Sequence, residues 1–151
     1  MLINDSLETL PFESCLKKQD SIKDFFKPKG DIGKNYEKII ELGKSAPSVP
    51  DAFKIEDNIV SGCQSIMYLY SYFENGKVIF LAESEALISR GLAALLVSVY
   101  SGESPTTILT CPPVFLEELG IPSSLSPSRS NGLASLFLRM KQDALKFLLK
   151  S

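Results

Sequence analysis

The sequence contains no histidine among its 151 residues. An imidazole is the usual base that activates a cysteine or serine nucleophile in proteases and acyl transferases, so the usual form of that chemistry is excluded. Exchange between sulfur atoms remains open, because a thiolate attacks another sulfur directly and no amine or alkoxide leaving group has to be protonated.

Cysteine is also scarce, with single residues at positions 15, 63 and 111 and no CxxC motif. An odd number of scattered cysteines argues against a disulfide framework, and a structural zinc site normally needs four Cys or His ligands. Asp5 and Glu8 stand where a secretory signal would carry basic residues. We therefore expect a reduced, cytoplasmic protein that holds no metal.

Long hydrophobic runs and an excess of one charge are missing too. The most apolar stretch, residues 87–100, contains Arg90 and is too short to cross a bilayer. The 16 basic residues nearly balance the 18 acidic ones, and the runs of lysine are short. Such a charge distribution does not favour binding to a phosphate backbone. We expect neither nucleic acid nor a membrane among the partners.

The pattern that is present is typical of one mixed domain, 44% apolar and 23% charged. The sequence predicts strands at 55–60, 65–74 and 77–83, and the dipeptide Asn75-Gly76 favours a tight hairpin between the last two. Helices are expected at 7–17, at 21–26, from a cap at Asp31 to about residue 45, at 85–100 with Ser84 as cap, from Ser104-Pro105, before Gly120, and from a cap at Ser126 to the end of the chain.

The predicted fold class is therefore α+β, with a three-stranded antiparallel sheet covered on one face by helices. We expect residues 1–30 to form an N-terminal helical extension packed on a single globular unit, residues 31–151. In the second strand Tyr68, Tyr70 and Tyr72 share one face, which we expect to pack against a helix.

Cys63 is the candidate reactive residue. It stands in the segment SGCQS, residues 61–65, on the predicted turn between two strands, where Gly62 allows a tight backbone. A free thiol has a pKa of about 8.5, so nearby cations or backbone amides would be needed to favour the thiolate. The alternative is that Cys63 is an inert packed side chain, which is what we expect of Cys15 and Cys111.

Four blocks of sequence extend this observation: YEKIIELG at 36–43, NIVSGCQS at 58–65, SEALISRGL at 84–92 and LSPSRSNGL at 125–133. In this order they resemble the SufE family of sulfur acceptors, and the resemblance covers about residues 33–148. It implies an α+β fold similar to the iron-sulfur scaffold IscU, with Cys63 at the tip of a loop between the first two strands.

The resemblance also implies a function. Cys63 would take sulfane sulfur from the persulfide of a PLP-dependent cysteine desulfurase of the SufS type and pass it to iron-sulfur cluster assembly. The chain would have no cofactor of its own, because the PLP belongs to the desulfurase. It would activate that partner rather than act as a stand-alone enzyme. We further hypothesise that the loop alternates between an inward, sheltered position and an outward, donating one.

Other residues of the blocks match the family's pattern. Arg90 and Arg129 match basic positions, and either residue could stabilise the thiolate, dock the desulfurase or only support the fold. Gln64 and Asn58 are expected to shape the turn through hydrogen bonds, and Gly62 is expected to set its backbone geometry.

Some positions depart from the family's pattern. Tyr68 replaces a frequent tryptophan, and Glu83 and Glu85 replace frequent aspartates, which leaves the partner paralogue open. Two other functions stay possible for the whole chain. One is an IscU-like metal or cluster scaffold, and the other is a non-catalytic interaction domain with an inert Cys63.

Overall fold

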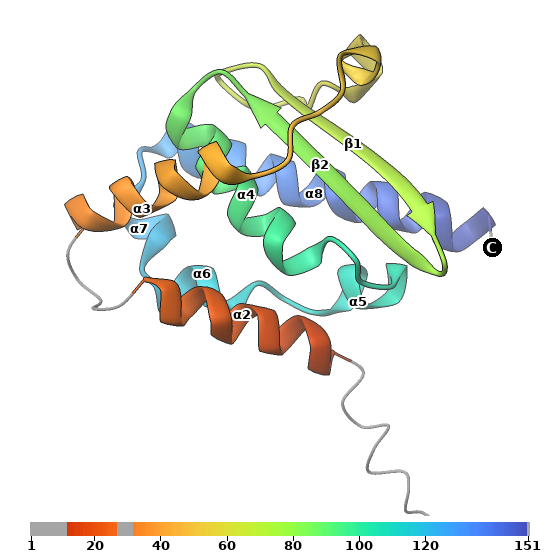
Figure 1. Ribbon diagram of the computed structural model, residues 1–151, viewed down its shortest axis with the longest axis horizontal. Coiled ribbons are helices and arrows are strands. Elements are labelled where there is room, and N and C mark those ends of the chain that lie inside the picture. Colours follow the sequence, from red (N-terminus) through yellow and green to blue (C-terminus); the bar gives the residue numbers. More distant parts are fainter. Residues whose placement is uncertain (1–11, 27–31, 151) are drawn as a thin grey trace, which may run out of the picture.

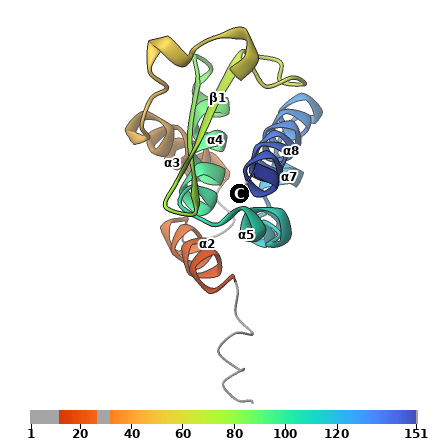
Figure 2. The same ribbon diagram turned by 90° about the vertical axis from the view of Figure 1, so that its right-hand side faces the viewer.

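The computed structural model describes residues 12–26 and 32–150. A two-stranded antiparallel hairpin lies over a group of helices (Figure 1). Helices α4 and α8 pack against the hairpin, and α2 and α3 pack on α4 (Figures 1 and 2). In chain order the elements are α2 (Glu13–Phe25), α3 (Ile32–Ser45), the 3-10 turns η1 (Asp51–Phe53) and η2 (Glu56–Asn58), β1 (Met67–Glu74), β2 (Lys77–Ser84), α4 (Leu87–Tyr100), α5 (Pro105–Thr110), α6 (Val114–Glu118), α7 (Ile121–Ser124) and α8 (Pro127–Lys150).

The hairpin forms where the sequence predicts it. Asn75 and Gly76 both have positive φ, 53° and 79°, which is the backbone geometry that a two-residue hairpin turn requires. Glu74 pairs with Lys77 on either side of this turn, and the strands stay in register along their whole length. The helix and antiparallel-sheet content confirms the α+β class.

The helices cover the more apolar face of the hairpin. This face carries the buried side chains of Met67, Leu69, Val78, Phe80 and Ala82. The tyrosines lie on the opposite face, where the ring of Tyr70 stacks on Phe53 with 3.9 Å between centroids. The expectation that the tyrosine row packs against a helix is wrong. Burying the face with more apolar side chains removes more apolar surface from water, and the tyrosine hydroxyls on the other face keep access to solvent.

The predicted strand at 55–60 is also wrong, so the sheet has two strands and not three in the part of the chain that the structure describes. Residues 56–58 instead form η2, and Ile59 makes only an isolated bridge to Tyr68. The carbonyls of Asp57 and Ile59 accept hydrogen bonds from the guanidinium of Arg139, at 2.7 and 3.3 Å. Carbonyls committed to a side chain are not available to a strand ladder.

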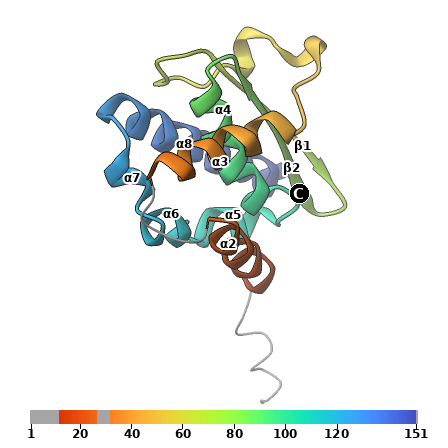
Figure 3. The same ribbon diagram turned by 60° about the vertical axis from the view of Figure 1, so that its left-hand side comes forward.

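Helix α4 is the buried centre of the fold, and α3 crosses it at a very short distance (Figure 3). The crossing depends on Gly43 and Gly91, because a Cβ on Gly43 would lie 2.7 Å from the backbone nitrogen of Gly91. A Cβ on Gly91 would collide with the carbonyl oxygen of Ile39. Only residues without a side chain allow the two backbones to approach in this way.

Among the described residues 12–26 a single helix, α2, runs through positions 18–20, where the sequence predicts a gap between two helices. The predicted helix start at residue 7 and the predicted cap at Asp31 lie outside the described residues, so those two predictions stay open. Lys18 on α2 forms an ion pair of 2.7 Å with Glu103, which is 6% exposed. This contact and the buried Cys15 attach α2 to the rest of the fold.

In the C-terminal half, two helices begin at the capping residues that the sequence predicts. The hydroxyl of Ser104 accepts a hydrogen bond from the backbone of Thr107 at the start of α5, and the hydroxyl of Ser126 does the same for Arg129 at the start of α8. Both caps confirm the predicted helix starts. Ser84 does not cap α4, since the N-cap position is Ala86. Within the described residues no helix is both long and apolar enough to span a bilayer.

Candidate functional site

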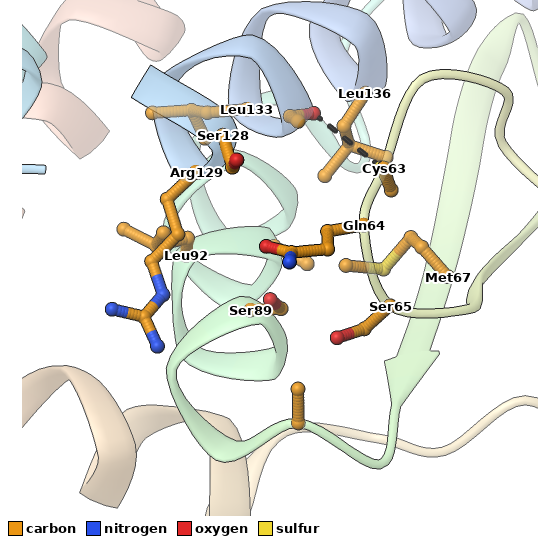
Figure 4. Close-up of a pocket in the computed structure, with 13 residues that line it drawn as sticks. Cys63, Gln64, Ser65, Met67, Ser89, Leu92, Ser128, Arg129, Leu133 and Leu136 are labelled. Carbon is orange, nitrogen blue, oxygen red and sulfur yellow. Dashed lines mark hydrogen bonds between the residues drawn. The ribbon is translucent and has the colours of Figure 1, made fainter. Parts of the chain in front are cut away.

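Cys63 lies in the segment between residue 60 and strand β1, and this segment rests on α8. The thiol of Cys63 donates to the carbonyl oxygen of Gly132 on α8, at 3.6 Å (Figure 4). A Cβ on Gly132 would lie 3.6 Å from the sulfur, so the helix surface meets the thiol at van der Waals distance. The side chain of Cys63 is half-buried as a result.

Gly62 brings this segment down onto the helix. It has φ +92°, in the left-handed region that favours glycine, and a Cβ there would collide with the hydroxyl of Ser135 on α8. Its predicted role in loop geometry therefore has a specific cause in the structure. Glycine is needed both for the backbone angle and for the close approach.

A cavity of about 70 Å³ lies beside the sulfur. Its walls come from the Cys63 segment, from the start of α4 and from the first turns of α8 (Figure 4). The lining residues are Cys63, Gln64, Ser65, Met67, Ala86, Ser89, Leu92, Ala93, Ser128, Arg129, Gly132, Leu133 and Leu136. A space of this size holds a few water-sized groups, so a further atom bonded to the thiol would fit without displacing the helices.

The electrostatic environment keeps the thiol protonated. Burial raises the pKa of Cys63 above its ordinary value, and burial is the only cause. Arg129 lines the cavity, but its side chain is exposed and its guanidinium extends away from Cys63 (Figure 4). In the position that the structure describes, the surroundings of Cys63 therefore disfavour the reactive thiolate.

The other predicted site residues separate into two groups. Gln64 and Arg129 line the cavity with Cys63. Arg90 lies elsewhere, because its Nε donates to the carbonyl of Gly43 at 2.9 Å and its Nη2 to the hydroxyl of Ser48 at 3.2 Å. Asn58 donates to the carbonyl of Phe53 at 2.8 Å. Of the open alternatives for Arg90, these contacts favour support of the fold at the end of α3.

The other wall residues of the cavity were not predicted. Gly132 carried a signal, since a glycine inside a helix is unfavourable and often marks a close approach. It ends the segment SRSNG, residues 128–132, which also contains Arg129. Leu92 and Leu136 gave no such signal, because their spacing is equally typical of ordinary core positions.

The other two cysteines are packed in the core, as predicted. Cys15 and Cys111 are 0% and 1% exposed, and the amide of Gln19 lies 3.8 and 3.7 Å from their two sulfurs. Burial, together with the neighbouring Cys111, raises the pKa of Cys15 to about 12. Among the described residues, no three Cys, Asp or Glu side chains converge as a metal site would require.

Comparison with known proteins gives a consistent result. The model of the SufE family, described as an Fe-S metabolism associated domain, matches residues 20–144. An uncharacterized SufE-like protein of Synechocystis is 38% identical over 119 residues, which are 79% of this chain and 75% of that protein. The sulfur acceptor protein CsdE of Escherichia coli is 35% identical over 119 residues, which are 78% of this chain and 81% of CsdE.

A solved structure extends the likeness to the fold. The solution structure of a hypothetical protein from Thermus thermophilus superposes with a TM-score of 0.73 at 26% identity. The superposition covers 87% of this chain and 96% of that one.

Proposed function

Because the chain belongs to the SufE family, we propose that it is a sulfur acceptor whose Cys63 takes sulfane sulfur from a SufS-type cysteine desulfurase. It then delivers that sulfur to iron-sulfur cluster assembly and stimulates the desulfurase. The single observation that carries the proposal is a half-buried thiol beside a cavity with room for one more atom. The E. coli relative is itself named a sulfur acceptor protein.

The transfer is a thiol–disulfide type of exchange. The thiolate of Cys63 attacks the terminal sulfur of the desulfurase persulfide, so one S–S bond forms as the other breaks. The desulfurase cysteine leaves as a thiolate, and the terminal sulfur stays on Cys63 as a persulfide. No oxidant, reductant or general acid is consumed, which fits a chain without histidine.

The position that the structure describes is unfavourable for accepting sulfur. Burial raises the pKa of Cys63 there, and the sulfur faces α8 rather than solvent. We propose that the loop swings outward to meet the desulfurase and returns with the sulfur to the cavity, where the surrounding walls hinder the approach of small thiols. Alkylation of Cys63 should therefore be much faster in the desulfurase complex than in the free protein. Equal rates would contradict the two-position loop.

Mass spectrometry of the intact protein tests the transfer. After incubation with the desulfurase, PLP and cysteine, we expect a gain of one sulfur atom that reductant removes. The Cys63→Ser variant should gain none, and Cys111→Ala, which keeps Cys63, should gain it normally. A gain that persists in Cys63→Ser would refute the assignment. Full stimulation of the desulfurase by that variant would instead favour a non-catalytic interaction domain.

A cluster scaffold makes a different prediction. An IscU-like protein should retain iron or zinc after anaerobic purification, whereas a sulfur acceptor should not. Measuring bound metal on the unloaded protein separates these two functions without any assay of the desulfurase.

A further inference from the structure

Arg139 on α8 joins three segments that are far apart in the sequence. Its Nη2 donates to the carbonyl of Asp57 at 2.7 Å and its Nη1 to the carbonyl of Ile59 at 3.3 Å. Its Nε donates to the carboxylate of Asp143 at 3.0 Å. The second oxygen of Asp143 accepts the hydroxyl of Ser71 on β1, at 2.6 Å. The guanidinium is therefore fixed on α8 and on the hairpin at the same time.

This network is largely withdrawn from water. The side chains of Arg139 and Asp143 are 21% and 10% exposed. Hydrogen bonds in which one partner is charged are shorter and stronger than neutral ones, and partial burial weakens screening by salt. The planar fork of arginine is suited to this task, since one side chain holds a carboxylate and two backbone carbonyls together.

The carbonyls that Arg139 holds lie immediately before the Cys63 loop. After Ile59 the backbone of Val60 is also held, because its nitrogen donates to the carbonyl of Met67 at 2.9 Å. Met67 is the first residue of β1. Residues 61–66 are thus the part of the loop between two anchored ends, and their tip can move by roughly 10 Å at full extension.

We propose that Arg139 is a positioning residue that clamps the root of the Cys63 loop, so that only residues 61–66 swing when the thiol leaves its cavity. The proposal rests on the mobile loop of the proposed function. Without the clamp, the root is held by the hydrogen bond from Val60 to Met67 and by the bridge of Ile59 to Tyr68, which then open more easily and let residues 57–60 move with the loop. The outward state then gains conformational freedom and becomes more populated.

Alkylation of the free protein tests the clamp, and it needs no desulfurase. The three thiols of the chain are separate probes in one molecule, because Cys63 reports the loop while Cys15 and Cys111 report opening of the core. For Arg139→Gln we expect the alkylation rate of Cys63 to rise roughly tenfold, the factor that corresponds to losing about 1.4 kcal/mol. Cys15 and Cys111 should stay as slow as in the wild type.

Two further variants keep the test decisive. Arg139→Lys retains the charge but cannot hold all three oxygens, so we expect a rate for Cys63 between those of wild type and Arg139→Gln. Asp143→Asn weakens the anchor of Arg139 and should also accelerate Cys63 alone. Lys18→Gln is the matched control, because it removes the ion pair with Glu103 near Cys15. It should leave Cys63 unchanged.

Each outcome of the alkylation experiment either supports the clamp or overturns it. If all three thiols accelerate together in the Arg139 variants, the residue supports the whole fold and the proposal is overturned. An unchanged rate at Cys63 would also overturn it. Persulfide formation measured separately on the same variants shows whether the sulfur transfer itself survives, so failure of the clamp does not count against the acceptor function.

Discussion

At the scale of single residues, the position of Cys63 depends on its neighbour. Gly62 and Gly76 both have positive φ, +92° and +79°. They differ in their surroundings, since a Cβ at 62 meets Ser135 on α8 and a Cβ at 76 has nothing within 4 Å. Backbone strain and loss of contact with α8 can therefore be measured separately.

We expect Gly62→Ala to release the loop. Both Gly62→Ala and Gly76→Ala should lose about 1 kcal/mol of stability through the unfavourable backbone angle. Only Gly62→Ala should also accelerate alkylation of Cys63, because the new methyl group lifts the loop from α8. Urea denaturation and alkylation rates of the two variants provide the measurement. Identical alkylation rates of Cys63 in the two variants would mean that Gly62 does not control how closely the Cys63 loop packs on α8.

At the scale of elements, two helices contain an interior glycine, and only one of these glycines is required by close packing. Gly91 lets α3 cross α4, and its added Cβ would collide with the carbonyl oxygen of Ile39. Gly132 on α8 faces Cys63, and its added Cβ would be in ordinary contact with the sulfur at 3.6 Å. The same substitution in two helix interiors should therefore have opposite effects.

Gly91→Ala should destabilise the protein by about 3 kcal/mol, because the backbones of α3 and α4 must separate. Gly132→Ala should be neutral or add up to about 1 kcal/mol, since alanine favours a helix. It should nevertheless slow sulfur loading, because its methyl group reduces the space beside the thiol. Urea unfolding and sulfur loading of both variants test this. Equal losses of stability would show that the helix crossing does not require a glycine.

The elements also show what the sequence can predict. Asn75-Gly76, Ser104 and Ser126 predict the hairpin and two helix starts correctly, because turns and caps depend on residues a few positions apart. The strand at 55–60 fails because its carbonyls bind Arg139, about eighty residues later. No local pattern reveals such a partner.

The candidate site follows the same division. Cys63 and Gly62 lie in a short motif, so the sequence alone is enough to propose them. The cavity beside the sulfur of Cys63 could not be predicted, because its walls come from α4 and α8 and only the fold brings these helices together.

At the scale of the whole molecule, buried acidic groups set how stability depends on pH. Burial raises the pKa of Cys63 and of Cys111, and it raises the pKa of Tyr100 as well. The pKa of Cys15 rises from 9.0 to about 12. In the unfolded chain these groups lose their protons at ordinary pKa values, so above pH 9 the unfolded state binds fewer protons than the native state.

These groups therefore leave the free energy of unfolding steady between neutral pH and about pH 8.5, and we expect it to fall as the pH rises from 9 toward 12. Urea denaturation in the presence of a reductant, repeated over this range, measures the fall. Cys15→Ala should be less stable near neutral pH because of the cavity it leaves, yet its stability should fall less steeply above pH 9. A wild-type stability that increases with alkalinity would contradict the sign.

The burial of Cys15 and Cys111 around Gln19 has a consequence for the persulfide that we propose on Cys63. A persulfide releases free sulfide when a second thiol of the same chain attacks its inner sulfur and closes a disulfide. The two remaining thiols are 0% and 1% exposed in the core, whereas Cys63 rests against Gly132. The folded chain thus offers no resolving cysteine, so the persulfide that we propose on Cys63 would lose its sulfur only to an acceptor that comes from outside.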